Sequence, residues 1–147
     1  MATFDMTAKS TVGVDSDSLA ILPDVRNQSY LVEAILDITK LVAAGTFSAV
    51  SNGDIFQVLE IPAGTVVIAA GAEVLTVMSG TSVTVDIDFA AGDDIVDGGD
   101  TSSTGYLASG TNGGANEPSA TTYTHFQSTT DTIDVKFIAG SSDVTSG

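Results

Sequence analysis

The sequence predicts an all-β protein: a jelly-roll-like antiparallel β-sandwich of seven or eight strands, with an N-terminal arm and a long acidic loop rich in Gly, Ser and Thr. Three observations favour this fold class. Residues 55–89 form three apolar runs rich in β-branched residues, which Pro and Gly turns separate. Residues 81–89 and 131–138 alternate between apolar and polar side chains. The strands and turns are also spaced as in two packed antiparallel sheets.

Residues 1–27 contain few apolar side chains, and Gly, Asp, Ser and Pro interrupt them. We expect an N-terminal arm with one short strand at most, lying either on a neighbouring subunit or as a poorly ordered terminus. Residues 28–147 are then expected to form a single β-sandwich domain. We expect no signal peptide and no transmembrane helix, because no charged start precedes an apolar run and no apolar run is long enough.

Residues 28–44 fit two kinds of structure. As a strand, the even-numbered residues from Tyr30 to Ile38 share one face, and Glu33 and Asp37 lie on the other. As a helix, an apolar stripe also forms. We favour a strand over residues 29–39 with a short turn at 39–41, because the neighbouring segments are strands. The sequence Ser51-Asn52-Gly53-Asp54 then predicts a tight turn.

The central region predicts three consecutive strands, Ile55–Ile61, 65–78 and 81–89, joined by turns at 62–64 and 79–80. Such short links predict an antiparallel meander. In 65–78, a continuous apolar run predicts cover on both faces, from a second sheet or another subunit, and Gly71 predicts a bulge or bend. A buried helix over 65–78 is the alternative.

The run over 81–89 alternates most clearly. One face carries Val83, Val85, Ile87 and Phe89, and the other carries Thr84, Asp86 and Asp88. Because successive side chains of a strand point to opposite faces, we expect an apolar core face and an acidic, solvent-facing one.

Residues 92–121 are predicted to form a long loop, of a length that is often functional. Its apolar anchors are Ile95, Val96, Tyr106 and Leu107. Two further strands are expected over 122–126 and 131–138, the second with Ile133, Val135 and Phe137 on one face. After Gly140 the chain is polar.

Charge is the strongest compositional feature. Nineteen acidic residues face three lysines and one arginine, for a net charge of −15 at pH 7. Such a charge repels phosphate backbones and anionic lipids, so we expect no nucleic-acid and no membrane partner. Two interpretations of the acidity stay open: solubility in a salty medium, and steering toward a basic partner. The chain has no cysteine, which excludes disulfides and thiolate chemistry.

Few residues of the sequence suit catalysis. His125 is the single histidine and lies in a predicted strand, so a structural role is the simpler interpretation. One His without Cys cannot make a zinc site, and the phosphate-binding and nucleophile-turn motifs are absent. Asp86 and Asp88 have the spacing of an acid–base pair, but any solvent-facing strand shows the same spacing, and there is no Trp to line a sugar cleft. We therefore predict no enzyme activity, no catalytic residue and no cofactor.

The acidic loop is the one candidate metal site. Its carboxylates are Asp93, Asp94, Asp97 and Asp100. Convergent carboxylates bind calcium, but here Ile95 occupies an EF-hand ligand position and no closing Glu follows. We predict a solvated loop without a metal, with calcium binding as the alternative.

Several short motifs follow one another in a fixed order between residues 28 and 107. They are Gly53-Asp54-Ile55, Val58-Leu59, Ile61-Pro62-Ala63-Gly64-Thr65, Val83-Thr84-Val85, Asp97-Gly98-Gly99-Asp100 and Gly105-Tyr106. This order resembles a group of small structural proteins of marine tailed bacteriophages. The motifs are turns and strands, and no catalytic residue is carried over. The chain departs from the group after Gly140, where one more apolar strand is expected.

The resemblance implies a β-sandwich that binds a capsid lattice, and head decoration (cement) as its role. We therefore expect a structural virion protein on the outer capsid surface, with the major capsid protein as partner. A homo-oligomer is expected, with a trimer fitting a local threefold axis. The arm around Phe4 and Met6 is expected to contact adjacent capsid subunits. The alternative is a receptor- or glycan-binding module of a phage tail fibre or spike, with loop 92–121 at its tip; a secreted enzyme accessory domain is a third possibility.

Overall fold

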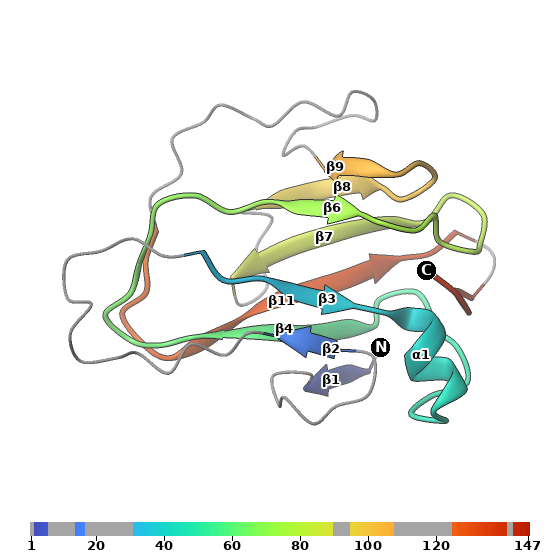
Figure 1. Ribbon diagram of the computed structural model, residues 1–147, viewed down its shortest axis with the longest axis horizontal. Coiled ribbons are helices and arrows are strands. Elements are labelled where there is room, and N and C mark those ends of the chain that lie inside the picture. Colours follow the sequence, from blue (N-terminus) through green and yellow to red (C-terminus); the bar gives the residue numbers. More distant parts are fainter. Residues whose placement is uncertain (1, 6–13, 17–30, 90–94, 108–124, 141–142) are drawn as a thin grey trace.

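The computed structural model describes residues 2–5, 14–16, 31–89, 95–107, 125–140 and 143–147. Strands are the main regular structure of these residues, with one short helix, which confirms the all-β class (Figure 1). The elements are β1 (Thr3–Asp5), β2 (Val14–Ser16), β3 (Ala34–Leu36), α1 (Ile38–Ala43), β4 (Ile55–Ile61), β5 (Val66–Val67), β6 (Ala72–Val74), β7 (Thr84–Phe89), β8 (Val96–Asp100), β9 (Gly105–Leu107), β10 (His125–Phe126) and β11 (Asp131–Ile138). The described strands number eleven, more than the seven or eight expected, because several pairings involve only two or three residues.

Five strands form the main sheet, in the order β1-β4-β11-β7-β8. β11 runs antiparallel to both β4 and β7, β8 runs antiparallel to β7, and β1 runs parallel to β4. The meander predicted for residues 55–89 is therefore wrong. β11 lies between β4 and β7, where the meander places residues 65–78, and the strands of that segment, β5 and β6, pair with β10 and β9 instead.

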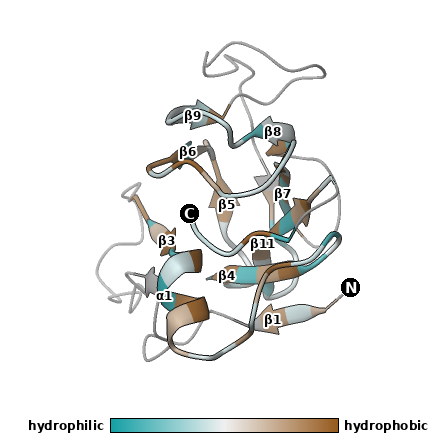
Figure 2. Cartoon of the chain, turned by 90° about the vertical axis from the view of Figure 1, so that its right-hand side faces the viewer, coloured by the Kyte–Doolittle hydropathy of each residue, from teal (hydrophilic) through white to brown (hydrophobic). Residues whose placement is uncertain are grey.

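Three two-stranded sheets, β10–β5, β2–β3 and β6–β9, accompany the main sheet. In the two ribbon views, β3 and β6 lie on the same side of the main sheet (Figures 1 and 2). The core contains Phe56, Val85 and Phe137 from the main sheet, together with Ile38 and Leu41 from α1. All five side chains are at most 2% exposed, so α1 closes one end of the core.

β4 and β11 have the predicted bounds, Ile55–Ile61 and Asp131–Ile138. Their pairing is irregular at Ile133/Asp134, as expected of a β-bulge. The predicted turn at 62–64 is present, with the Thr65 N–H donating to the Pro62 carbonyl at 3.2 Å. Gly64 there has a φ of 86°, a value that suits glycine and strains other residues.

The ambiguous residues 28–44 contain both kinds of structure. Of the strand favoured over 29–39, residues 29 and 30 lie outside the described residues; within 31–39 the strand is β3, and α1 follows in place of the expected turn. Asp37 explains the change, because its carboxylate accepts a hydrogen bond from the Lys40 N–H at 2.8 Å and so caps α1. The predicted facing is confirmed for Ala34 and Leu36, which are partly buried, while Ile35 is exposed.

Two predicted segments differ from the structure. Residues 65–78 form neither one long strand nor a helix, but β5 and β6 separated by residues 68–71, which include Gly71. Residues 92–121 are not all loop, since β8 and β9 lie within them and the buried side chains of Ile95 and Val96 anchor this region. Residues 108–124 lie outside the described residues, and they include the first three residues of the predicted strand 122–126. The last two residues of that strand form β10.

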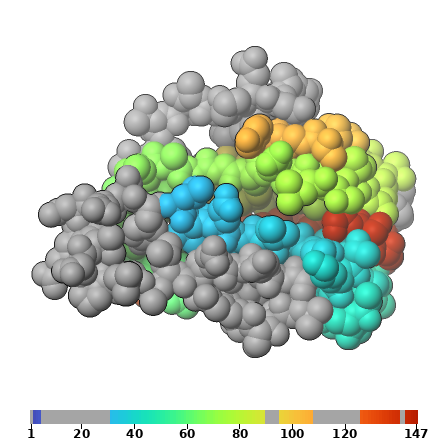
Figure 3. Space-filling view, viewed as in Figure 1, coloured from blue at the N-terminus to red at the C-terminus, as the bar shows by residue number. Residues whose placement is uncertain are grey.

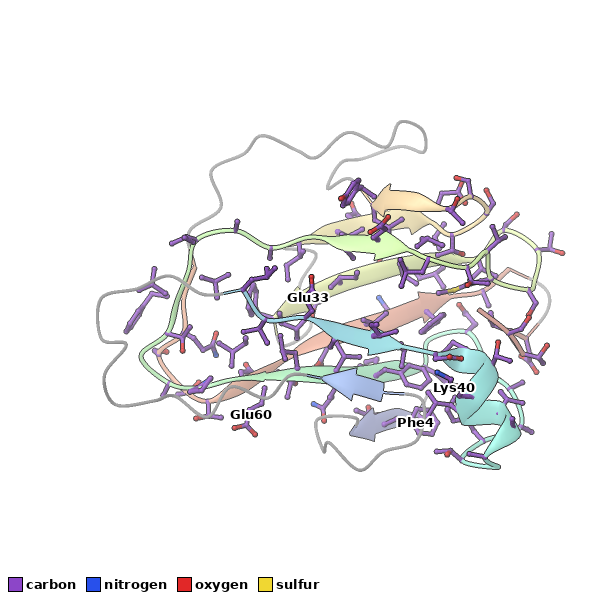
Figure 4. All side chains as sticks on the ribbon, in the orientation of Figure 1. Phe4, Glu33, Lys40 and Glu60 are labelled. Carbon is purple, nitrogen blue, oxygen red and sulfur yellow. The ribbon has the colours of Figure 1, made fainter. Side chains whose placement is uncertain are left out.

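The N-terminal region contains two short strands, β1 and β2, where at most one was expected. β1 lies at the edge of the main sheet beside β4. Phe4 stacks on Phe56 with ring centroids 4.9 Å apart and contacts Phe47 at 5.1 Å (Figure 4). The Phe4 side chain therefore packs within its own chain, and its expected contact with a capsid subunit stays a prediction. Met6, the other residue of that expectation, lies outside the described residues.

The described C-terminal residues, 143–147, do not form the regular strand expected after Gly140, but they pair with another part of the chain. Val144 and Val50 form an isolated antiparallel bridge, and both side chains are fully buried. Two backbone hydrogen bonds join them, at 2.8 and 2.9 Å. The tail thus contributes to the core although its composition is polar.

Candidate functional site

The described residues contain no group of three or more His, Cys, Asp or Glu side chains that could hold a metal ion. His125 lies on β10, where it pairs with Val67 of β5. In the acidic loop, Asp93 and Asp94 lie outside the described residues, and Asp97 and Asp100 are exposed on β8. The structure thus describes two of the four carboxylates considered as an alternative calcium site, and both lie on a strand.

The Asp100 carboxylate already accepts hydrogen bonds from Ser102, two residues further along the same turn. Its two carboxylate oxygens accept hydrogen bonds from the Ser102 N–H at 2.8 Å and the Ser102 hydroxyl at 2.9 Å. The Ser102 backbone bond, followed by the hydroxyl bond, lowers the pKa of Asp100. This arrangement stabilises a turn between β8 and β9.

Asp86 and Asp88 were expected on a solvent-facing surface, and that expectation is wrong. Their exposed fractions are 3% and 4%. The Asp86 carboxylate accepts from the Lys136 ammonium at 3.0 Å and from the Gly98 N–H at 3.0 Å. β8 and β11, which flank β7, supply both donors, so a buried charge is compensated across three strands. These contacts hold Asp86 in place inside the sheet, away from solvent.

A second polar network crosses β4 and β11. The Thr132 hydroxyl accepts from the Gln57 amide at 3.1 Å and donates to Asp134 at 2.6 Å. Asp134 is directly opposite Asp88 of β7 in the register. The pKa of Asp134 is raised, chiefly because burial removes the carboxyl from solvent. The negative charge of Asp131 also raises the pKa of Asp134, while the Thr132 hydrogen bond lowers it without outweighing burial.

The outward-facing apolar side chains form the other notable feature. On β5 and β10, Val66 and Phe126 are cross-strand partners with exposed fractions of 53% and 61%, and Ile68 follows at 61%. On and after β6, Leu75 is 61% exposed, and Tyr106 of β9 is 60% exposed. The atoms of β6 and β9 form a continuous part of the surface in Figure 3. Exposed apolar side chains that lie next to one another, as Val66 and Phe126 do, are typical of binding surfaces.

Residues 66–71, called here the apolar edge segment, were predicted to be covered on both faces. Val66 and residues 68–71 are instead exposed. The sequence signal for this surface is the absence of any charged residue between Glu60 and Glu73. That signal shows an apolar run, but periodicity alone does not separate a buried run from an exposed one.

Within the described part of the chain, no helix is long and apolar enough to span a membrane. No protein-family model matches the chain, and neither a curated protein nor a solved structure shows significant similarity to it.

Proposed function

We propose that this protein is a non-enzymatic structural component of a phage virion, a head decoration protein that binds the outer face of the capsid and stabilises the shell. We also propose that its strands form a jelly-roll-like β-sandwich, antiparallel except for the β1–β4 pair. In that arrangement β2–β3 and β6–β9 are the layer that faces the main sheet.

The main support is the combination of outward apolar side chains with a strongly acidic chain. Val66, Ile68 and Phe126 offer apolar area at one place, and Leu75 and Tyr106 offer it at another. A protein with two such surfaces can bridge neighbouring subunits of a lattice. Burial of these side chains would stabilise the assembled shell, because a ligand that binds only the assembled state shifts the equilibrium toward it.

The charge supports a location outside the shell. A net charge of −15 opposes contact with packaged DNA but does not oppose contact with a protein surface. The order of turn and strand motifs from Gly53 to Tyr106 resembles phage structural proteins and supports the same role. The proposed partner is the major capsid protein, and a homo-oligomer, such as a trimer at a local threefold axis, fits a repeated lattice.

In the proposed mechanism, the exposed apolar side chains make the contact with the capsid. Phe4 is occupied by Phe47 and Phe56 of its own chain and therefore supports the fold. Deletion of residues 1–14 is expected to weaken attachment through loss of β1 and its core contact. If the deleted protein keeps both its stability and its capsid occupancy, β1 contributes to neither.

The test is titration of the purified protein onto bare capsids, with bound copies counted by quantitative gel or electron cryo-microscopy. Saturation at hundreds of copies, in proportion to capsomers, is the expected result. Binding of only a few copies would favour a tail fibre or spike module that recognises a receptor or glycan. No binding by folded protein would overturn the head-decoration proposal.

A further inference from the structure

The backbone of the apolar edge segment lies between two short strands, each of which has one described neighbour. β5 pairs with β10, and β6 pairs with β9. Between them, residues 68–71 belong to no strand, and no hydrogen bond joins their backbone to another described residue. Backbone N–H and C=O groups of this kind are free to pair with an added strand.

The side chains of the segment favour such an addition. Ile68 and Val66 are more than half exposed, and the three residues 69–71 are small and exposed. A Cβ built on Gly71 meets no atom within 4 Å, so space is open beside the backbone there. Phe126, across from Val66, adds an aromatic ring at the end of the segment. Edge addition combines main-chain hydrogen bonds with contacts from apolar side chains, and the segment offers both.

Charge indicates what the segment binds. No charged side chain occurs between Glu60 and Glu73. Both glutamates are exposed; Glu60 lies on β4 before the turn at 62–64 (Figure 4), and Glu73 lies on β6 after the segment. The segment itself is uncharged and the chain as a whole is strongly acidic, so a partner strand is complementary if it is apolar in the middle and basic at its ends. A second copy of this chain fits poorly, because each copy carries a net charge of −15 and the two would repel one another.

We propose that the apolar edge segment, residues 66–71, is a docking site for an extended apolar segment of a partner protein that is flanked by Lys or Arg, bound by strand addition. This deepens the proposed function by naming the surface and the chemistry of the partner. The docking site rests on the proposed function in one respect only, namely that the partner is a capsid subunit.

The first experiment measures peptide binding to the full chain by fluorescence anisotropy. The probe is a synthetic peptide of alternating valine and threonine with a pair of lysines at each end. Two control peptides carry glutamates at the ends or N-methyl groups on alternate backbone nitrogens. We expect binding of the lysine peptide only, and weaker binding as salt is added, because screening reduces the attraction. Equal binding of either control, or no binding of the lysine peptide, would overturn the proposal.

The second experiment uses matched variants. Ile68→Ser is expected to weaken peptide binding about tenfold through loss of apolar contact. Leu75→Ser is the control, because Leu75 has the same exposed fraction of 61% and lies outside the segment. The double variant Glu60→Gln, Glu73→Gln is expected to weaken binding of the lysine peptide at low salt and to reduce its salt dependence. Equal losses for Ile68→Ser and Leu75→Ser would contradict the assignment of the site.

Capsid titration with the same variants separates this inference from the proposed function. If wild-type protein fills capsids and Ile68→Ser fills them equally at the same concentrations, decoration stands and the docking site is wrong. If the lysine peptide binds but capsids do not, the docking site stands and head decoration is wrong. Self-association that grows with salt and is lost in Ile68→Ser would identify a second copy as the occupant and overturn the proposal.

Discussion

Lys136 and Lys40 are the cations that the described residues contain, and they pair with carboxylates in very different surroundings. The Lys40–Asp37 pair lies on α1 at 3.1 Å, with side-chain exposures of 69% and 26%. The Lys136–Asp86 pair lies across β11 and β7 at 3.0 Å, with exposures of 40% and 5%. Since solvent screens the first pair far more than the second, the two lysines should differ in their contribution to stability.

We expect Lys136→Met to lower the free energy of unfolding by about 1–3 kcal/mol, because the Asp86 charge stays buried without its ammonium partner. Lys40→Met, the matched control on α1, should cost about 0.5 kcal/mol or less. Chemical denaturation at neutral pH measures both. In Lys136→Met, a second change, Asp86→Asn, should recover part of the loss. Equal effects of the two lysine changes would show that the Asp86 pair is as well screened as the surface pair.

Asp134 should respond to pH in the direction opposite to an ordinary paired carboxylate. Its pKa is raised in the folded protein above the ordinary value of 3.8, so the folded state binds a proton more readily than the unfolded state. The stability linked to this proton is fully present below pH 3.8 and is lost as the pH rises through the raised pKa of the folded protein. Asp134→Asn should therefore stabilise the protein at neutral pH, and the gain should vanish in acid.

The control for Asp134 is Asp100→Asn. The Ser102 hydrogen bonds lower the pKa of Asp100, so its charged form is favoured in the folded state. This change should slightly destabilise the protein at neutral pH, with the difference again vanishing in acid. Unfolding curves of both variants against pH check the signs. If Asp134→Asn destabilises the protein at neutral pH, burial is not the dominant influence on the pKa of Asp134.

At the scale of elements, regular alternation predicted strands well. β4 and β11 begin and end as predicted, because bulky β-branched and apolar residues alternate and turn residues bound them. β8 was missed because Val96–Asp100 is short and rich in Gly and Asp, which are depleted in strands, and β9 was missed because Gly105–Leu107 has only three residues. These two strands form through pairing with β7 and β6, a tertiary contact that local composition does not contain.

The turn before β5 offers a clean test of backbone strain. Gly64 and Gly71 both have open space where a Cβ would be, but only Gly64 has a positive φ, at 86°. Gly64→Ala should cost about 1 kcal/mol, because alanine is strained at positive φ. Gly71→Ala should be neutral or slightly stabilising, since it removes freedom from the unfolded chain. Thermal denaturation compares the two, and equal losses would show that φ is not the cause.

At the scale of the whole molecule, the order of strands in the sheet could not be predicted. Short turns favoured residues 65–78 as the strand between β4 and β7, yet β11 takes that place. For the same reason the polar residues of β7 were assigned to the wrong surroundings, because Gly98 and Lys136, which bind Asp86, come from strands distant in sequence. The apolar edge segment was recognised as apolar, but its exposure depends on which strands lie beside it.

The net charge of −15 should make stability depend on ionic strength. Repulsion among the acidic residues opposes the compact state, and salt screens it, with a Debye length of about 30 Å at 0.01 M and about 8 Å at 0.15 M. We expect the Tm to rise by several degrees as sodium chloride increases over this range. An uncharged osmolyte at equal osmolality is the control. An unchanged or falling Tm would show that attractive pairs such as Lys136–Asp86 dominate.

The central place of β11 also bears on how the chain folds during synthesis. β11 follows β4 and β7 in the sequence by at least 40 residues, yet both strands need it as their neighbour. Until residues 131–138 emerge, these two strands have apolar faces and unpaired edges exposed together. The main sheet therefore cannot be completed before β11 has been synthesised, and its distant pairings make folding slow compared with that of a local meander. Truncation within β11 would leave a chain that aggregates in the cell instead of folding as a smaller domain.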